Sequence, residues 1–291
     1  MSIDIEKYSS KHKPTWCPGC GNFGISMALK KALSELNISP TETFISFDIG
    51  CNGNGADTFG TYGFKGLHGR SIALATGVHL ANRKFTTIVE LGDGACFHEG
   101  IDHLINAIRS NYDITVLIHN NRNFALTTGQ ATIGTPKGKS MYALPYGKPE
   151  KDYNTDELIL SLHPTFYAKG YSGDLVELTD IIKKGIKHKG CSIIDIAQLC
   201  PSYNKECTPE WFSKHIVKIS TLKKYSETSF EDAHNLVQKM IKEEKIYTGI
   251  IYQDKNTKTF YDNLHNRKSS TKELVEEVKE FNIKNLLKTF E

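Results

Sequence analysis

The sequence predicts an α/β fold in which a parallel β-sheet is covered by helices on both faces. Two observations indicate this. Short runs rich in Ile, Val, Phe and Thr alternate along the chain with segments of helical periodicity, and repetition of strand and helix builds parallel sheets. The chain also has 291 residues, enough for one large domain with an extension.

Four apolar runs are expected to be strands buried on both faces, because Ile, Val, Phe and Thr recur in them with little polar alternation. They cover residues 43–50, 85–92, 114–120 and 192–199. A later run, residues 245–254, is expected to add one more strand. Together these runs predict the frame of the sheet.

The segments between the runs have the apolar spacing of helices. They are residues 24–37, 69–83, 100–111 and 178–188. Residues 127–165 are less regular and contain Gly, Pro and Lys. Because a long excursion from a compact α/β domain tends to be functional, we expect this segment to contribute to function.

The composition changes after about residue 210, where Lys, Glu, Asn and Tyr become frequent. We therefore interpret residues 1–210 as the main domain and residues 211–291 as a C-terminal extension. Within the extension, the amphipathic pattern of residues 271–290 predicts a helix.

Composition and charge exclude several classes of protein. Hydrophobic residues make up 39% and charged residues 24%, as in ordinary globular proteins. The first residues are polar, and no apolar run approaches the ~20 residues that span a bilayer. The net charge of +3 is too small to indicate nucleic acid. We expect a cytoplasmic protein with neither nucleic acid nor membrane as partner.

The chain has 7 cysteines, and two of them, Cys17 and Cys20, flank Pro18 and Gly19 in "TWCPGCGNFG". An odd number of cysteines without a secretion signal argues against a disulfide framework. Metal binding or redox chemistry is the better expectation for some of them. Taken alone, this pair fits a disulfide, a zinc knuckle, a redox dithiol or part of an iron–sulfur site.

A second pattern combines a Gly-Asp-Gly turn with a pair of asparagines. Gly92, Asp93 and Gly94 follow one predicted strand, and Asn120 and Asn121 end the next, about 25 residues later. Both therefore lie at the carboxyl edge of the sheet, where open α/β sheets bind ligands. Carboxylate and amide oxygens suit Mg²⁺, which is often shared with phosphates.

This spacing resembles the thiamine diphosphate signature. The resemblance implies that the side chains of Asp93 and Asn121 and the backbone carbonyl of Asn123 bind Mg²⁺. A chance Gly-Asp-Gly turn beside an unrelated Asn pair is the alternative, and the strand–helix–strand context argues against it.

A wider set of segments resembles one family. "WCPGCGNFGI", "DIGCNGNG", "YGFKGLHGRSIALATGVHLAN", the Gly-Asp-Gly turn and "NNRNFALTTGQ" occur in this order. Over roughly residues 10–205 they are similar to the β subunit of the 2-oxoacid:ferredoxin oxidoreductases. The resemblance implies the thiamine diphosphate-binding fold, and thiamine diphosphate, Mg²⁺ and a [4Fe–4S] cluster as cofactors.

The resemblance also implies the ligands of the cluster. Cys17, Cys20 and Cys51 would supply three thiolates, and Cys200, which follows the last strand of the main domain, would supply the fourth. Cys207 and Cys96 are weaker candidates for that position. A structural zinc site using the same four thiolates remains an alternative.

His68 in "GLHGR" is implied to lie near the diphosphate or the reacting centre, and we predict a catalytic role for it. The remaining residues expected to contact the cofactor are Gly50, Cys51, Gly92, Gly94 and Thr127. Position 54 is Asn, where many relatives have Lys or Arg near the substrate carboxylate. The sequence therefore leaves pyruvate and 2-oxoglutarate both open as substrates.

The implied activity is the coenzyme A-dependent oxidative decarboxylation of a 2-oxoacid, with electrons passed through the cluster to ferredoxin. Thiamine enzymes also need a glutamate from a pyrimidine-binding domain, and one diphosphate-binding domain accounts for nearly all of this chain. We therefore expect activity only with an α subunit, with γ and δ subunits as further possible partners. The alternative is a non-catalytic, metal-stabilised binding or electron-carrier subunit of the same fold.

Overall fold

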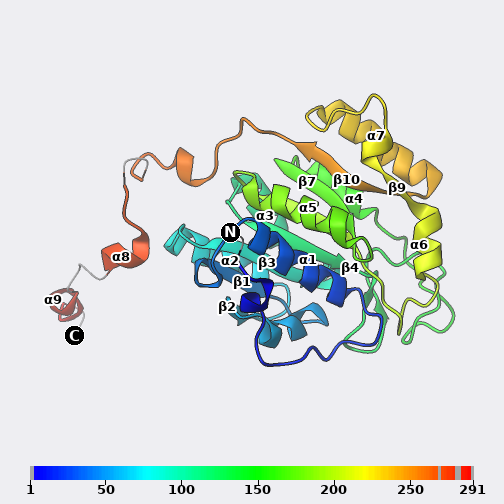
Figure 1. The fold of residues 1–291 in the computed structure, drawn as a ribbon, viewed down its shortest axis with the longest axis horizontal. Helices are drawn as coiled ribbons and strands as arrows, with labels where there is room; N and C mark the ends of the chain where they lie inside the picture. Colours follow the sequence, from blue (N-terminus) through cyan, green and yellow to red (C-terminus); the bar gives the residue numbers. More distant parts are fainter. Residues whose placement is uncertain (1–2, 268–269, 279–282, 290–291) are drawn as a thin grey trace.

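One eight-stranded sheet forms the centre of the molecule (Figure 1). The computed structural model describes residues 3–267, 270–278 and 283–289. The strands lie in the spatial order β2-β1-β3-β4-β8-β7-β10-β9. Their bounds are β1 (Thr43–Phe47), β2 (Tyr62–Lys65), β3 (Thr86–Gly92), β4 (Thr115–Asn120), β7 (Phe166–Tyr171), β8 (Ser192–Ala197), β9 (Ile216–Lys218) and β10 (Ile246–Gln253).

The four strands expected from the apolar runs are β1, β3, β4 and β8, and they are neighbours in the sheet. All pairs among them are parallel. The fifth expected strand is β10, which pairs antiparallel with β7. The sheet is therefore mostly parallel, as predicted, with one antiparallel pair inside it.

Helices cover both faces of the sheet (Figure 1). Adjacent residues of β3 alternate between the two cores: Ile88 packs in one and Val89 in the other, as the two-residue period of a strand requires. The core on the Ile88 face is completed by α1 (Asn22–Glu35) and α5 (Leu175–Lys187). The other core is completed by α2 (Ser71–Ala81), α3 (Ile101–Ser110), α4 (Thr155–Ser161) and α7 (Phe230–Glu243).

The C-terminal region leaves the sheet after β10 and extends away from the body, as the orange and red segment at the left of Figure 1 shows. Residues 271–290, expected to form one helix, contain two short ones, α8 (Leu274–Val278) and α9 (Lys284–Leu287). Ile283 lies in a turn before α9, while residues 279–282 and 290 are outside the described residues. The described part of this segment therefore does not form one continuous helix.

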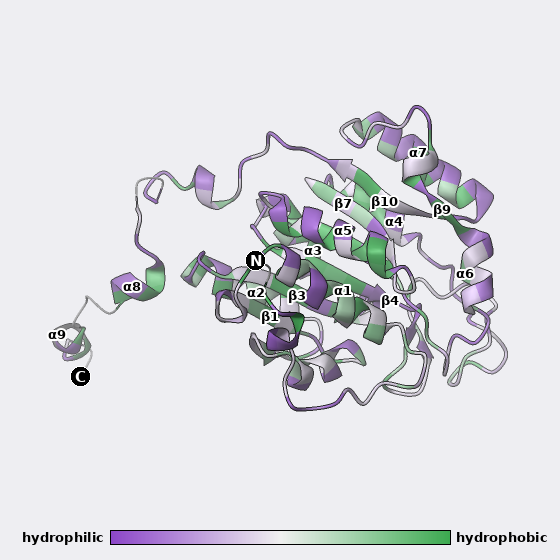
Figure 2. Cartoon of the chain, in the orientation of Figure 1, coloured by the Kyte–Doolittle hydropathy of each residue, from purple (hydrophilic) through white to green (hydrophobic). Residues whose placement is uncertain are grey.

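The division of the chain at residue 210 stays a prediction. Helix α6 (Pro209–His215) spans this point. Strands β9 and β10 follow it and extend the same sheet. The hydropathy colouring shows that β10 is as apolar as the neighbouring β7 (Figure 2). In the described residues, no helix is both long and apolar enough to cross a membrane.

The functional edge of the sheet is the one at which β1, β3, β4 and β8 all end. The loops that follow these strands carry the residues singled out by the sequence. After β1 comes the 3-10 helix η3 (Asn52–Thr58), and after β3 comes the π-helical turn η4 (Ala95–Glu99). After β4 comes a small ribbon of β5 (Asn123–Phe124) and β6 (Gln130–Ala131).

Candidate functional site

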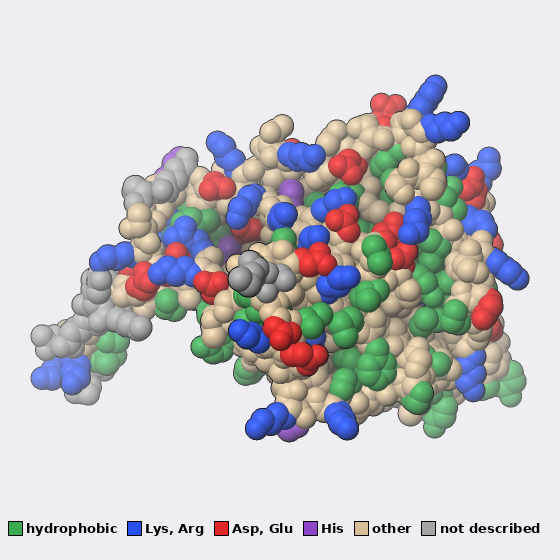
Figure 3. Space-filling view, viewed as in Figure 1, with side chains coloured by type: hydrophobic (Ala, Val, Ile, Leu, Met, Phe, Trp, Pro, Cys, Tyr) green, Lys and Arg blue, Asp and Glu red, His purple; other side chains and the backbone are tan. Residues whose placement is uncertain are grey.

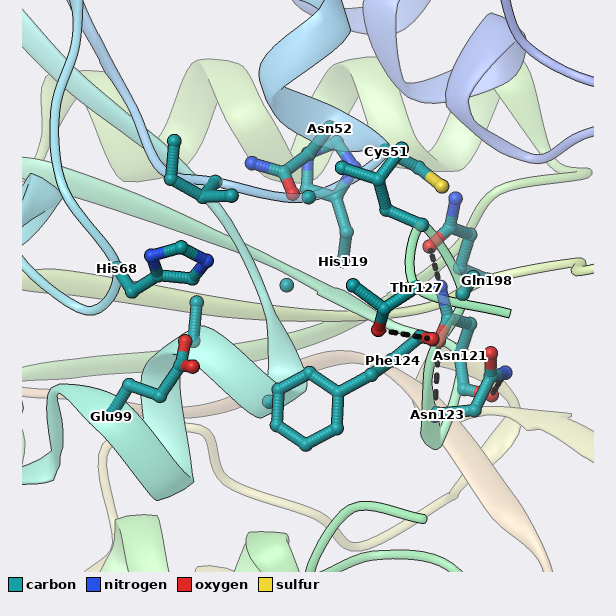
Figure 4. Close-up of a pocket in the computed structure, with 17 residues that line it drawn as sticks. Cys51, Asn52, His68, Glu99, His119, Asn121, Asn123, Phe124, Thr127 and Gln198 are labelled. Carbon is teal, nitrogen blue, oxygen red and sulfur yellow. Dashed lines mark hydrogen bonds between the residues drawn. The ribbon is translucent and has the colours of Figure 1, made fainter. Parts of the chain in front are cut away.

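A pocket of about 500 Å³, open to solvent, lies at this carboxyl edge (Figure 4). The residues expected at a cofactor site that line it are Gly50, Cys51, His68, Gly92, Gly94, Asn121, Asn123 and Thr127. They come from the loops after β1, β3 and β4 and from the segment before α2, so the fold brings together positions that are far apart in sequence.

Asp93 lies just behind the pocket wall and is only 2% exposed. Among the described residues its carboxylate oxygens make no hydrogen bond of good geometry, although Thr132 and the backbone of Asn121 lie near enough to lower the pKa against the effect of burial. Burial raises the pKa of this carboxyl to about 7. An unpartnered buried carboxylate is costly, and a bound cation is one way to compensate it.

The asparagine pair after β4 divides into two roles. Asn120 turns away from the pocket, and its Nδ2 donates to Asp195 Oδ2 over 3.3 Å. Asn121 lines the pocket, and its Oδ1 accepts a hydrogen bond from the backbone N–H of Asn123 over 3.1 Å. The side-chain Oδ1 of Asn123 is buried without a hydrogen-bond partner among the described residues, and the role of its backbone carbonyl as a metal ligand stays a prediction.

Gly94 is required by a close approach of an aromatic ring. A Cβ atom built on Gly94 would lie 2.2 Å from Phe124 Cε1. The ring of Phe124 also meets His98 edge-on, with centroids 5.5 Å apart. Phe124 and the neighbouring Leu126 both line the pocket, so this aromatic wall can only close over a glycine.

His68 and Glu99 lie opposite one another at one end of the pocket (Figure 4). The loop that carries His68 is held by the buried Asp48, whose carboxylate accepts from the backbone N–H groups of Gly69 and Ser71 over 2.9 and 3.1 Å. Glu99 reaches the pocket because the segment after Gly-Asp-Gly is π-helical. Burial raises the pKa of Glu99, and nearby His68 opposes that shift.

Four cysteines gather beside the pocket: Cys17, Cys20, Cys51 and Cys200. We call them the cysteine group. Burial, together with smaller effects of the other three thiols, raises the pKa of Cys51 to about 12. For Cys20 the pKa is raised to about 11, mainly by burial and also by Cys200 and Cys17. This mutual influence indicates that the four thiols lie within electrostatic range of one another.

A glycine allows the N-terminal loop to reach the end of β8. The N–H of Gly21 donates to the carbonyl of Leu199 over 3.0 Å. A Cβ atom at Gly21 would lie 2.8 Å from Gln198 Cγ and 2.9 Å from Leu199 N. The loop with Cys17 and Cys20 is thereby pinned next to Cys200, and α1 begins directly after it.

The remaining cysteines lie elsewhere. Cys207 precedes α6, where burial raises its pKa and its charged neighbours are Arg122, Lys139 and Glu206. Cys96 and Cys191 are fully buried in the core on the α3 side of the sheet. Of the three candidates for a fourth cluster ligand, Cys200 is the one that lies with Cys17, Cys20 and Cys51.

A buried polar network under the pocket was not foreseen from the sequence. It links Gln198, Asn22 and His119, all at most 3% exposed. Gln198 Nε2 donates to Asn22 Oδ1 over 2.7 Å, and His119 Nδ1 lies 2.8 Å from the same oxygen. In the sequence Gln198 lies within the predicted strand 192–199 and does not stand out, because an amide gives no signal comparable to that of a cysteine such as Cys200.

Among the described residues, no three His, Cys, Asp or Glu side chains are arranged to hold a single metal ion. The oxygens at Asn121 and Asn123 belong to other residue types. Any cation at this edge would therefore combine one carboxylate, that of Asp93, with amide or carbonyl oxygens.

Two family models match the chain. Residues 48–196 match the model described as thiamine pyrophosphate enzyme, C-terminal TPP binding domain. Residues 200–269 match a model that describes the C-terminal part of the pyruvate ferredoxin oxidoreductase beta subunit. The first match begins at the Asp48 that holds the His68 loop and ends within β8, so it spans the loops that form the pocket.

Curated relatives match most of the chain. The beta subunit of 2-oxoacid:ferredoxin oxidoreductase from Saccharolobus solfataricus is 36% identical over 264 residues, covering 88% of this chain and 87% of that protein. A beta subunit from Aeropyrum pernix is 38% identical over 218 residues, covering 75% and 69%. The 2-oxoglutarate oxidoreductase subunit KorB of Mycobacterium tuberculosis is 34% identical, covering 68% and 53%.

A solved structure has the same fold. It is a 2-oxoglutarate:ferredoxin oxidoreductase from Magnetococcus marinus with 2-oxoglutarate, coenzyme A and succinyl-CoA bound. The TM-score is 0.86 at 26% identity, and the match covers 99% of this chain and 96% of that one. The sheet, the pocket at its edge and these similarities agree, and the chain belongs to the beta subunits of the 2-oxoacid:ferredoxin oxidoreductases.

Proposed function

We propose that this chain binds thiamine diphosphate with Mg²⁺ in the pocket, holds a [4Fe–4S] cluster on the cysteine group, and works with an α subunit. The observation that supports this best is the position of Cys51. It lines the pocket and also lies within electrostatic range of Cys17, Cys20 and Cys200. A cofactor in the pocket and a cluster on the cysteines would therefore be adjacent, as electron transfer between them requires.

The donor set at Asp93 fits Mg²⁺. Its two unpartnered carboxylate oxygens, together with an oxygen each from Asn121 and Asn123, are the hard ligands that this ion prefers. A bound cation would compensate the buried charge of Asp93. Phosphate oxygens of the cofactor are the usual remaining ligands of such an ion.

The cysteine group fits a cluster. Each thiolate of a [4Fe–4S] cluster binds a different iron atom, so the four sulfurs need to surround a group larger than one ion. Two side chains already donate hydrogen bonds to them: Ser202 Oγ to Cys17 Sγ over 3.2 Å, and Gln198 Nε2 to Cys20 Sγ over 3.8 Å. Donors of this kind suit a negatively charged thiolate cluster.

The proposed reaction is the oxidative decarboxylation of a 2-oxoacid with coenzyme A as acyl acceptor and ferredoxin as electron acceptor. Thiamine diphosphate supplies the electron sink for decarboxylation, and the cluster carries single electrons. The chain's own part is to orient the cofactor through Asp93 and Asn121 and to shield it with the Phe124 wall. His68 and Glu99 face the open end, where a proton could be held or moved.

One contact favours 2-oxoglutarate as a substrate. Asn54 itself carries no charge, but Lys65 from β2 donates to Asn54 Oδ1 over 3.4 Å. The Lys65 ammonium group therefore places a positive charge beside the loop that contains Asn54. Such a charge suits the second carboxylate of 2-oxoglutarate, which pyruvate lacks. Relatives and a structural neighbour named for 2-oxoglutarate agree with this choice, and pyruvate is the competing substrate.

The test uses the full chain purified anaerobically with its partner subunit. Removing the carboxylate in Asp93→Ala should reduce bound thiamine diphosphate to a few per cent of the parent, because the metal would lose its charged ligand. Coenzyme A-dependent reduction of ferredoxin should fall in parallel with either 2-oxoacid. Cofactor content by chromatography and reduction rates with 2-oxoglutarate and pyruvate measure both effects.

The matched control is Asp102→Ala on α3, whose side chain is largely exposed, and it should retain the cofactor. Parent-like thiamine content in folded Asp93→Ala would rule out the assigned metal site. Turnover by the chain without its partner subunit would rule out the shared active site.

A further inference from the structure

We propose that Gln198 is a positioning residue that joins the proposed thiamine site to the proposed cluster site. Its single amide group contacts Asn121 in the first and Cys20 in the second. The inference rests on the proposed function and adds to it a residue for which no motif or comparison gives a role. It also explains why an uncharged polar side chain is buried at this place.

The backbone fixes where Gln198 lies. It is the first residue after β8, and its N–H donates to the carbonyl of Asn120 over 2.9 Å, which continues the pairing of β8 with β4. The residue is 2% exposed and lines the pocket. The side chain is therefore held between the end of β4 and the cysteine loop.

The two ends of the amide have different partners. Gln198 Oε1 accepts from Asn121 Nδ2 over 3.0 Å, the contact drawn in Figure 4. Gln198 Nε2 donates to Asn22 Oδ1 over 2.7 Å and to Cys20 Sγ over 3.8 Å. An amide oxygen accepts and an amide nitrogen donates, so these partners define the orientation of the group at both ends.

The orientation of Gln198 determines that of Asn121. Because Asn121 Nδ2 is committed to Gln198, Asn121 Oδ1 must point the other way, toward the N–H of Asn123 and the region of Asp93. This is the oxygen that the proposed Mg²⁺ would use. Partners that orient a metal ligand typically contribute about 10- to 100-fold to metal affinity.

The other end of the amide acts on the cysteine group. A hydrogen bond from Nε2 to Cys20 Sγ withdraws negative charge from the sulfur and favours the reduced, more negative cluster. The donor is held in place because Asn22 Oδ1 is also bonded to His119 Nδ1 over 2.8 Å. An amide oxygen only accepts, so His119 Nδ1 carries the proton and the imidazole shares in fixing Asn22.

The experiment compares two variants in the anaerobic complex of the full chain with its partner subunit. Gln198→Met keeps the length of the side chain and removes both the acceptor and the donor. We expect the dissociation constant for thiamine diphosphate with Mg²⁺ to rise about 10- to 100-fold and the reduction potential of the cluster to fall. Fluorescence titration and EPR-monitored redox titration measure the two quantities.

Gln198→Glu keeps an oxygen for Asn121 Nδ2 but removes the nitrogen donor. We expect the potential to fall while the thiamine dissociation constant stays within a few-fold of the parent. Gln238→Met makes the same chemical change on the exposed face of α7, and it should leave both quantities unchanged.

The outcomes separate this inference from the proposed function. If the parent complex contains neither thiamine diphosphate nor iron, the proposed function is wrong. If the parent contains both and folded Gln198→Met changes only one quantity or neither, the joining role is wrong. Should Gln198→Met fail to fold, an unchanged potential in Gln198→Glu overturns the inference, and a lowered one supports it.

Discussion

At the scale of single residues, this site concentrates buried groups that ordinary folding would avoid. Glu90 in the second half of β3 is 2% exposed, and its Oε1 has no hydrogen-bond partner among the described residues. His119 Nε2 lies 3.9 Å from Glu90 Oε2. Burial lowers the pKa of His119 to about 3, so the imidazole is neutral and does not compensate the carboxylate.

This environment makes a prediction about pH. Burial raises the pKa of Glu90 from 4.5 to about 8. Between these values the folded chain binds a proton that the unfolded chain has lost, so this group lowers stability as the pH rises from about 4.5 to 8. Glu90→Gln should therefore gain stability relative to the parent across this window, on the order of 3–5 kcal/mol at its upper end.

Urea unfolding at pH 5 and pH 8 measures that difference, with the exposed Glu150→Gln as the matched control. A gap between parent and Glu90→Gln that is the same at both pH values would contradict the assignment of the shift to Glu90.

At the scale of elements, β7 joins the sheet through a buried charge cluster. Lys169 Nζ lies 2.6 Å from Asp156 Oδ1 of α4 and 2.7 Å from Asp195 Oδ2 of β8. Burial alone would lower the pKa of Lys169, but the two carboxylates outweigh it and raise the pKa. Tyr167 also donates to Asp156, so the cluster ties β7, β8 and α4 together.

Lys169→Met should destabilise the fold by about 3–5 kcal/mol, because it leaves two carboxylates buried without their cation. Adding Asp195→Asn should restore part of that loss. Lys187→Met on the exposed side of α5 makes the same change without the cluster and should cost little. Urea unfolding of the three variants checks this, and a loss equal to that of Lys187→Met would show that the cluster contributes nothing.

The same cluster explains what the sequence could and could not predict. Strands β1, β3, β4 and β8 were predictable because β-branched and other apolar residues dominate them, although β3 and β8 each carry one buried acid. Strand β7 was missed because "FYAKGY" contains Lys169, whose burial is possible only through carboxylates brought from two other elements. The prediction of one helix over 271–290 was also wrong. The periodicity of apolar residues does not show where a helix is interrupted in a segment that has few contacts with the core.

The part of the site that could be predicted from the sequence is the part built from short sequence motifs. Gly-Asp-Gly, the Asn pair and Cys-x-x-Cys are short patterns with a defined chemistry, and the ends of parallel strands bring them to one edge. Gln198, Asn22 and Glu99 belong to no such pattern. Their proximity to the site arises from Gly21 meeting Leu199 and from the π-helical turn after Asp93, which only the folded chain reveals.

At the scale of the whole molecule, charges of both signs are interspersed over the visible face (Figure 3), in keeping with the small net charge of +3. Among the described residues, ion pairs of Arg83 with Glu273 and of Lys84 with Glu276 fasten the C-terminal segment to the body. Arg83 Nε and Nη2 donate to the two carboxylate oxygens of Glu273 over 3.0 and 2.9 Å. The guanidinium also lies 3.7 Å from the ring centroid of Tyr261.

Glu273→Gln should release this segment, because two charge-assisted hydrogen bonds of about 1.5–3 kcal/mol each would be weakened. We expect limited proteolysis after residue 270 to become at least tenfold faster, with the rest of the chain as resistant as before. Glu231→Gln on α7 is the control. Cleavage at the parent rate would show that the segment is held by other contacts.

The cysteine group has a consequence for how the protein is made. Ser202, which donates to Cys17 Sγ, is 185 residues further along the chain. At roughly 5–20 residues per second of synthesis, Cys17 and Cys20 exist for roughly 10–40 s before Cys200 is added. Throughout that interval they are free thiols in an unfinished protein. Loading of the proposed cluster would therefore follow translation of β8, and oxygen that reaches the nascent chain earlier would attack thiols that this cluster needs.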